Sequence, residues 1–334
     1  MNIGVVIRSA ASITPSWTTA ALIAAASRQG HLVWVVEVRN LGVDVHRVTG
    51  RAFRFPPNAD SSPASVSTAL QQRTTRRSLV DMARLDLLLL RCAPLDPTLL
   101  ALALRIEDAG VEVVNRPAGL ARVLSKAWLA SHDLPTPETL VTRSRGSAHL
   151  FHQDQGDIVV KPDRGSGGVG VQAVQKGDNA GLDDAFTAAR KAGGLVVLQP
   201  RLHDPAGERR LVVCDGQILG GYVRKSRAGE FRHNLKRGAT PSPLPPDPRD
   251  ARIVARLAPL LLEIGVRFAG LDVLGGRLVE VNAVNPGGTV HADALHGTRL
   301  ADRVVRLLTR AERTEDGLPT PPDEEAGRRP DRAR

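Results

Sequence analysis

Apolar and polar positions in the first third of the chain alternate between strand-like and helix-like segments. The predicted elements, in chain order, are strand 3–8, helix 18–29, strand 32–38, strand 85–91, helix 97–109 and strand 111–114. Strands that alternate with helices in this way predict a parallel sheet and an α/β fold. Segment 57–78 is rich in Ser, Thr, Gln and Arg, and we expect it to be a mobile loop.

The pattern changes after about residue 119, where glycine and proline separate shorter segments. The predicted elements are helix 120–131, strands 158–161 and 171–174, helix 182–192, strand 195–199, a hairpin of strands 210–213 and 218–223, helix 249–264 and helix 298–311. A polar, proline-rich loop occupies 226–248. Residues 312–334 have almost nothing apolar, which predicts a disordered tail.

Composition excludes some classes of protein. With 334 residues and 42% apolar content, the chain is long enough for two or three domains with a sizeable core. No apolar run reaches the roughly 18 residues of a membrane-spanning helix, and the apolar start is too short for a signal peptide. Cys92 and Cys214 lie in strand-like runs, so we expect them to be buried free thiols, which is typical of a cytoplasmic protein. We also expect no membrane association.

The net charge of +10 allows two interpretations. Nucleic-acid binding is disfavoured, because the basic residues are scattered and only 3% of residues are aromatic, too few for a stacking platform. A basic enzyme that handles polyanionic substrates fits better. The basic residues are mostly arginine, so each lysine marks a place where a compact point charge is useful.

A glycine turn near the C-terminal end joins two short apolar strands that carry three oxygen-bearing side chains. Glu280 and Asn282 are two residues apart, so they share one face of their strand, and Asp272 lies on the preceding strand. Carboxylate and amide oxygens are typical ligands of hard cations such as Mg²⁺. An ordinary exposed hairpin with solvated acids is the alternative.

The length of the turn decides whether these acids converge. A two-residue turn at 275–276 would make Asp272 face away from Glu280, whereas a three-residue loop at 275–277 would place the two opposite each other. We expect the three-residue loop. Only this loop leaves a core-facing side made of Leu271, Val273, Val279 and Val281.

A second motif is the glycine-rich run of Gly165, Ser166, Gly167 and Gly168 between two predicted strands. The strand that follows it, and the absence of Gly-Lys-Ser/Thr, argue against a Walker loop. A glycine-rich loop between strands can close its backbone N–H groups over phosphates, although a plain flexible hairpin tip would look alike. Lys161 directly precedes the loop and Lys126 lies on the helix before it, which strengthens the phosphate interpretation.

Together these motifs resemble the ATP-grasp superfamily, and within it the prokaryotic glutathione synthetases, in the branch that includes ribosomal-protein glutamate ligases. The resemblance covers residues 1–311. It rests on segments 85–91, 114–117, 137–143, 160–168, 207–216, 232–235, 270–273 and 280–282. It implies an N-terminal substrate-binding domain over 1–118, a small subdomain with the flap over 119–195 and a subdomain with the metal site over 196–311.

The resemblance also implies residue roles. The ATP contacts would be Lys126, Lys161, Gly165, Ser166, Gly167, Gly168, the hinge residues Gln199 to Leu202, and Glu208 for the ribose. Two Mg²⁺ ions, with Mn²⁺ as a possible replacement, would be bound by Asp272, Glu280 and Asn282. The phosphoryl group and acyl substrate would be surrounded by Arg210, Arg224, Arg232 and Asn234. A homodimer or homotetramer is implied as well.

Three positions depart from the family pattern. The metal-binding asparagine is usually followed by a stretch ending in Ser-Pro, whereas Asn285, Pro286, Gly287 and Gly288 stand here. Pro200 and Arg201 replace the usual hinge residues, and 236–237 replaces small residues. We therefore expect Asn285, Gly287 and Gly288 to contact the substrate.

The expected activity is that of an ATP-dependent ligase, which joins a small-molecule carboxylate to an amine through an acyl phosphate. An authentic glutathione synthetase, using γ-glutamylcysteine and glycine, is one alternative. A non-catalytic basic nucleotide-binding protein that kept the fold is another, against which the intact acids and lysines argue.

Overall fold

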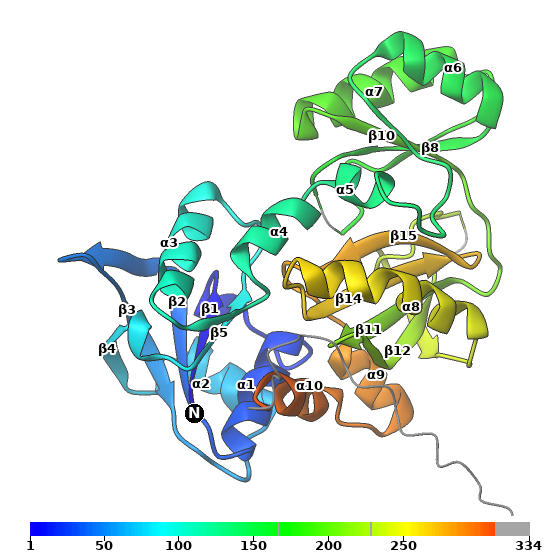
Figure 1. Cartoon of the computed structure of the whole chain (residues 1–334). Coiled ribbons are helices and arrows are strands. Elements are labelled where there is room, and N and C mark those ends of the chain that lie inside the picture. Colours follow the sequence, from blue (N-terminus) through cyan, green and yellow to red (C-terminus); the bar gives the residue numbers. More distant parts are fainter. Residues whose placement is uncertain (166, 228, 311–334) are drawn as a thin grey trace, which may run out of the picture.

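The computed structural model describes residues 1–165, 167–227 and 229–310 as helices, strands and loops arranged around three sheets (Figure 1). Ser166 and the predicted tail 312–334 lie outside the described residues. A six-stranded sheet has the order β4-β3-β2-β1-β5-β6, a four-stranded sheet the order β7-β10-β8-β9, and a five-stranded sheet the order β13-β12-β11-β14-β15.

The six-stranded sheet contains the predicted parallel strands and two antiparallel ones that the prediction missed. Its strands are β1 (Asn2–Ile7), β2 (Leu32–Asp44), β3 (Arg47–Phe55), β4 (Arg77–Asp81), β5 (Leu87–Arg91) and β6 (Glu112–Val114). β1 lies between β2 and β5 and pairs with both in parallel, while β3 and β4 extend the sheet antiparallel. Its helices are α1 (Thr18–Arg28), α2 (Pro63–Gln71) and α3 (Pro97–Asp108).

The expected mobile loop at 57–78 is wrong, because α2 occupies its middle. Ser62 and Ser65 form a capping box, Pro63 stands in the first turn, and Val66 and Leu70 are buried one helical turn apart. The expected helix 120–131 is also two short helices, α4 (Pro117–Val123) and α5 (Lys126–Ala130). The second begins at a Ser125 cap.

The four-stranded sheet is antiparallel throughout and has an apolar core of its own. Its strands are β7 (Leu140–Thr142), β8 (Ile158–Pro162), β9 (Gln172–Val174) and β10 (Val196–Pro200). Helices α6 (Arg145–Gln155), which was not predicted, and α7 (Asn179–Gly193) complete this unit. Phe186 of α7 is fully buried in this core.

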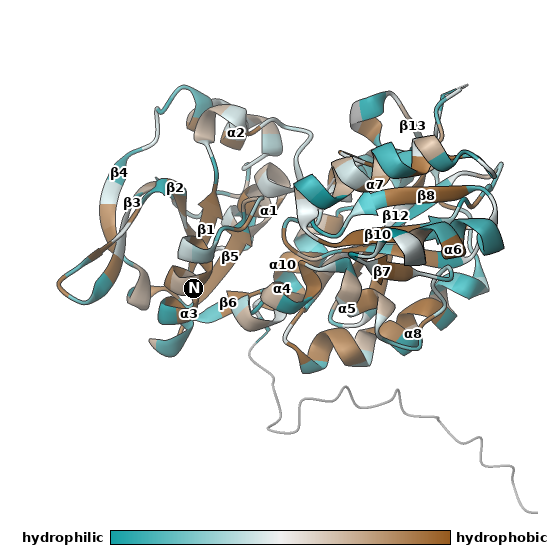
Figure 2. Ribbon diagram, turned by 90° about the horizontal axis from the view of Figure 1, so that it is seen from above, coloured by the Kyte–Doolittle hydropathy of each residue, from teal (hydrophilic) through white to brown (hydrophobic). Residues whose placement is uncertain are grey.

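The five-stranded sheet comprises β11 (Glu208–Cys214), β12 (Gln217–Lys225), β13 (Thr240–Pro243), β14 (Phe268–Leu274) and β15 (Arg277–Asn282). The helices of this part are α8 (Pro248–Glu263), α9 (Thr289–His296), which was not predicted, and α10 (Leu300–Leu308). Three short 3₁₀ turns lie at Ala10–Ser12, Met82–Arg84 and Leu235–Arg237. Helix α10 packs between this sheet and α1, so the six-stranded and five-stranded sheets share a continuous apolar core (Figures 1 and 2).

Candidate active site

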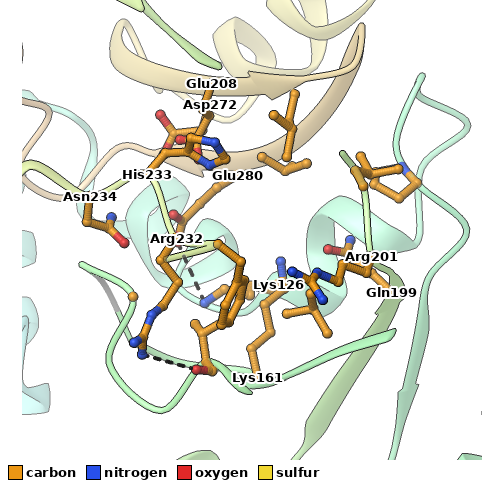
Figure 3. Close-up of a pocket in the computed structure, with 18 of the residues that line it drawn as sticks. Lys126, Lys161, Gln199, Arg201, Glu208, Arg232, His233, Asn234, Asp272 and Glu280 are labelled. Carbon is orange, nitrogen blue, oxygen red and sulfur yellow. Dashed lines mark hydrogen bonds and ion pairs between the residues drawn. The ribbon is translucent and has the colours of Figure 1, made fainter. Parts of the chain in front are cut away.

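A pocket of about 910 Å³, partly open to solvent, lies between the four-stranded and five-stranded sheets. Figure 3 shows side chains from both sheets and from the loops between them pointing into it. Eleven predicted site residues line this pocket: Lys126, Lys161, Gly165, Gly168, Gln199, Leu202, Glu208, Arg232, Asn234, Asp272 and Glu280. The structure therefore brings together residues that are far apart in sequence, such as Lys126 and Glu280, which are about 150 residues apart.

The β14–β15 hairpin places Asp272 directly opposite Glu280, as expected, but by another route. The predicted three-residue loop is wrong, since Leu274 pairs with Arg277 across a two-residue turn at 275–276. Both turn glycines have positive φ, +57° and +73°, as a tight hairpin turn requires. A β-bulge at Val279 then shifts the register by one residue.

The bulge also changes which apolar side chains face the core. Leu271 and Val273 are fully buried as expected, and Val281 packs against the same core. Val279 instead lines the pocket beside Glu280, and Leu278 is the buried residue. One extra residue thus turns the acids and an apolar side chain toward the same cavity.

Asp272 is the centre of a buried charge cluster behind the pocket wall, with only 3% of its surface exposed. Its Oδ1 lies 2.8 Å from Nε of Arg210 and 2.7 Å from Nη2 of Arg224. Nδ2 of Asn282 donates a hydrogen bond to Oδ2 at 3.1 Å. Arg210, Arg224 and Asn282 do not line the pocket themselves, but all three contact the acid that does.

The same hairpin fits a hard cation. Both oxygens of Asp272 already contact nitrogen atoms of Arg210, Arg224 or Asn282, so a cation would share this carboxylate with them. Glu280 lies opposite, and among the described residues it pairs only with Lys126, whose Nζ is 3.8 Å from Oε1. No group of three His, Cys, Asp or Glu residues suited to a metal occurs in the described part of the chain. A bound Mg²⁺ would therefore use these two acids, the Asn282 amide and oxygens of its ligand.

The two predicted lysines reach the pocket from neighbouring elements. Lys126 Nζ donates to the carbonyl oxygens of Asp163, at 3.1 Å, and Gly165, at 3.4 Å. Burial, together with the nearby Lys126 charge, lowers the pKa of Lys161 to about 8, although Glu280 partly opposes this shift. A desolvated lysine gains the most from an anionic ligand.

Asp163 is a positioning residue that the sequence reading missed. Its carboxylate is buried, and Oδ1 accepts hydrogen bonds from Ser125 Oγ at 2.8 Å and from Ala127 N at 3.2 Å. It therefore fixes the start of α5, and with it Lys126, against the strand that carries Lys161. Its place between Pro162 and the glycine run was the available signal.

The glycine flap joins β8 to β9, as predicted, and lies against segment 229–239. Gly165, Gly167 and Gly168 all have positive φ. A Cβ on Gly168 would lie 2.3 Å from Oδ1 of Asn234, whereas one on Gly167 would meet nothing within 4 Å. Asn234 thus packs against Gly168 of the flap, and any side chain at position 168 would collide with it.

The hinge between the two sheets follows β10. Gln199 is anchored by a hydrogen bond from Nε2 to Thr139 Oγ1 at 2.9 Å, and Pro200 offers no backbone N–H. Glu208, at the start of β11, forms an ion pair with Arg224, and its other oxygen is 3.6 Å from Nδ1 of His233. Glu208 therefore links the pocket to the buried cluster around Asp272.

Several lining residues were not predicted, and most of them are apolar. They are Pro137, Val159, Val169, Val171, Leu274, Val279 and Phe231, with His233 beside them. Val159 shares the pocket face of its strand with Lys161, so strand alternation could have identified it. The Phe231 ring lies 5.6 Å from the guanidinium carbon of Arg201 and 5.2 Å from that of Arg232.

Asn285, Gly287 and Gly288 do not line this pocket. Gly288 lies behind Arg210, where its backbone N donates to Thr18 Oγ1 at 3.1 Å. Oδ1 of Asn285 is buried without a hydrogen-bond partner among the described residues. The segment thus faces the boundary between the six-stranded and five-stranded sheets.

An antiparallel sheet with a glycine flap that closes on a second sheet with paired acids defines an ATP-grasp protein, and solved structures share this fold. A D-cycloserine synthetase matches with a TM-score of 0.65 at 18% identity, over 92% of this chain and 98% of that one. D-alanyl-alanine synthetase A of Vibrio cholerae matches with a TM-score of 0.59 at 13% identity, over 92% and 97%.

Sequence comparison gives the family. The model for the prokaryotic glutathione synthetase N-terminal domain matches residues 1–121, and the model for its ATP-grasp domain matches 125–297. The chain belongs to the prokaryotic glutathione synthetase family, whose members are ADP-forming ATP-grasp ligases that make C–N bonds. The predicted fold and family are confirmed.

Relatives include a glutathione synthetase of Synechococcus elongatus, 29% identical over 92% of this chain and 98% of that protein. One of Prochlorococcus marinus is 37% identical over 60% of this chain and 66% of that protein. No helix in the described part of the chain is long and apolar enough to cross a bilayer.

Proposed function

We propose that this ligase activates a small-molecule carboxylate by transfer of the ATP γ-phosphoryl group, and that an amine then displaces phosphate to form an amide. The observation that carries the proposal is the convergence of Lys126, Lys161, Asp272 and Glu280 on one pocket. Two point charges and two acids are what a nucleotide's phosphates and their cation require.

The phosphate end of the site is formed by Lys126, Lys161 and the flap. The flap glycines allow backbone N–H groups to approach the phosphates closely. When bound, Mg²⁺ neutralises charge on the phosphoryl group. We assign two such ions, which Mn²⁺ can replace, to Asp272, Glu280 and Asn282. The Arg210 and Arg224 side chains hold Asp272 in place for this task.

The nucleoside end lies along the hinge. Backbone groups between Gln199 and Leu202 would bind the adenine edge, and Val159 and Val279 offer apolar contact to its faces. Glu208 would accept hydrogen bonds from the ribose hydroxyls. Pro200 removes one backbone donor, so base recognition depends on the remaining ones.

Acyl transfer is assigned to the cationic side of the pocket. Arg232 and Asn234 extend from segment 229–239 toward the phosphate end, next to the flap. Arg210 lies between Asp272 and Gly288, where a cation can stabilise the oxyanion of the tetrahedral intermediate by about 3–4 kcal/mol. The attacking amine needs no covalent catalyst, because phosphate is a good leaving group.

The substrate pair is the open part of the proposal. Relatives are named glutathione synthetase, which favours γ-glutamylcysteine and glycine. The segment from Asn285 to Gly288 departs from the family pattern beside Arg210, which favours another acid or amine. Two buried free cysteines support a cytoplasmic setting, and family resemblance supports a homodimer or homotetramer.

An ADP-release screen of the purified protein against paired carboxylates and amines tests the proposal. The first pair is γ-glutamylcysteine with glycine, and each acid is also assayed without amine. Amine-dependent ADP formation is expected for at least one pair and should be lost in Asp272→Ala. Nucleotide binding without any such activity would identify a non-catalytic binding protein instead.

A further inference from the structure

Arg91 is a buried arginine without a counterion among the residues that the structure describes. It ends β5, only 5% of its surface is exposed, and its Nη1 is buried without a hydrogen bond. Its recorded contacts are a hydrogen bond from Nε to Thr19 Oγ1 at 3.3 Å and the face of Phe268 at 5.9 Å. No carboxylate forms an ion pair with it within the described ranges.

Such an arrangement is costly unless something else compensates the charge. An unpaired ion in a protein interior loses its hydration without return. Burial lowers the pKa of Arg91 only to about 9, so the guanidinium stays charged at neutral pH. The chain does pair its other buried arginines, as Arg209 with Asp250 and Arg224 with Asp272 show. Arg91 is therefore arranged to receive an anion from outside the chain.

The surroundings of Arg91 also favour an anion. A small cavity adjoins it, lined by Leu22, Asn115, Phe268 and Pro286 among others. The position is the carboxyl edge of the parallel sheet beside β1, where strand order reverses and where open α/β sheets bind ligands. Helix α1 begins next to it with no side-chain cap, so N–H groups of its first turn add positive potential.

Segment 285–288 lies between this cavity and Arg210 of the proposed reaction centre. Pro286 lines the cavity, and Gly288 lies against Arg210, whose Cγ would be 3.4 Å from a Cβ at that position. Thr18, next to Thr19, accepts hydrogen bonds from the backbone N of Gly288 and of Thr289. The segment therefore contacts both the cavity beside Arg91 and the Arg210 side chain.

We propose that Arg91 binds a carboxylate of the acyl substrate that is remote from the reacting carboxylate. The substrate class is then an acid with a second anionic group, and segment 285–288 spans the distance between its two ends. This inference rests on the proposed ligase function, and it adds a second anchoring point to the site.

Thermal unfolding tests the site without turnover. The probes are acetate and its uncharged isostere acetamide, with wild type, Arg91→Met and the surface control Arg105→Met. Acetate should stabilise wild type and Arg105→Met but not Arg91→Met, and acetamide should stabilise none. Without ligand, Arg91→Met should unfold at the same temperature as wild type or higher, because a buried unpaired charge is removed. A clear loss of stability in Arg91→Met would show a structural arginine and overturn the proposal.

Kinetics test the role in the ligase. With any acid found in the screen, beginning with γ-glutamylcysteine and its α-carboxamide analogue, Arg91→Met should raise the acid KM by roughly 30-fold or more and leave the ATP KM unchanged. The variant should no longer distinguish the acid from its carboxamide. Equal acid KM in wild type and variant would overturn the inference while leaving the ligase function intact. If the screen finds no activity, the ligase function fails, and the acetate experiment still decides the anion site.

Discussion

Asp272 lies directly opposite Glu280 although only two residues form the turn between their strands. The bulge at Val279, not the turn, brings the two acids to one face. Deleting Val279 should therefore leave Asp272 paired with Glu280 in a regular ladder. Leu278 and Glu280 would then be consecutive residues whose side chains point to opposite faces of the strand. We expect Mg²⁺-dependent ADP formation to survive with a raised ATP KM, since one apolar wall of the pocket is lost. Val279→Ala is the control for the side chain alone, and loss of metal dependence in the deletion would contradict this reading.

Asp272 and Glu280 should respond differently to neutral substitution. Asp272→Asn leaves the buried Arg210 without its counterion and Arg224 with Glu208 alone, so we expect a loss of about 3 kcal/mol in unfolding free energy. Glu280 has one ion-pair contact, with Lys126 at 3.8 Å, and is partly exposed, so Glu280→Gln should cost less than about 1 kcal/mol. Both should reduce ADP formation by roughly 100-fold or more.

Denaturant unfolding and a coupled ADP assay separate the two effects. Glu280→Gln is thus the cleaner test of the metal site, because its folded state is preserved. Full activity in Glu280→Gln would rule out its role as a metal ligand. Equal stability loss in both variants would contradict the buried charge cluster.

Lys161 should make nucleotide binding pH-dependent. Its pKa in the folded protein, about 8, lies below the ordinary lysine value, so it loses its proton as pH rises through about 8. Bound phosphates favour the charged form, so nucleotide affinity should fall by up to about tenfold per pH unit above that value. Between pH 8 and the ordinary lysine pKa, Lys161 is protonated in the unfolded chain but largely deprotonated in the folded protein. The contribution of Lys161 to the free energy of unfolding therefore rises with pH in this range.

Calorimetric titration with ADP from pH 7 to 9, in buffers of different ionisation enthalpy, measures affinity and proton uptake together. Lys161→Arg keeps its charge and should show a flat profile over this range. An unchanged dissociation constant in wild type would contradict the lowered pKa.

The fold of the catalytic half could be predicted because its signals are local. The Asp215-Gly216 turn and the apolar runs around it identify the β11–β12 hairpin, and the structure has that hairpin. Helix α2 was missed because its polar composition hid a capping box at Ser62 and the buried pair Val66 and Leu70. Weighing the cap above the composition would have found it.

Other features depend on contacts that no local pattern encodes. Helix α9 begins at Gly288 without a side-chain cap, and Thr18, about 270 residues away in sequence, accepts its first N–H groups. The counterions of Arg210 and Arg224, and the lack of one at Arg91, likewise appear only when distant strands meet. The bulge at Val279 also could not be predicted, although it involves residues close in sequence, because both turn lengths were compatible with the sequence.

Phe231 should help to hold the nucleotide. Its segment follows β12 of the five-stranded sheet, and Arg201, which contacts its ring, follows β10 of the four-stranded sheet. The ring therefore lines the pocket between segments that come from both sheets. Phe231→Ala should raise the ATP KM about three- to tenfold, because an apolar contact and two cation–π contacts are lost. Phe231→Tyr keeps the ring and should behave like wild type, so a similar loss in both variants would contradict a role for the aromatic face.

Gly168 and Gly167 form a matched pair for testing how the flap meets Asn234. Both have φ near +70°, so alanine at either position adds a similar strain of roughly 1–2 kcal/mol. Only at Gly168 would the new Cβ collide, at 2.3 Å from Asn234 Oδ1. We expect Gly168→Ala to lower kcat/KM for ATP by about tenfold more than Gly167→Ala, because segment 229–239 must move away from the flap.

A double-mutant cycle shows whether the collision is the cause. Asn234→Ala removes the atom that Gly168→Ala would strike, so the two substitutions together should cost clearly less than the sum of their separate effects on kcat/KM. The same cycle built with Gly167→Ala should be additive, because nothing lies within 4 Å of that position. Additivity in both cycles would mean that the flap and Asn234 act independently, and the contact seen between them would then have no part in closing the site over the phosphates.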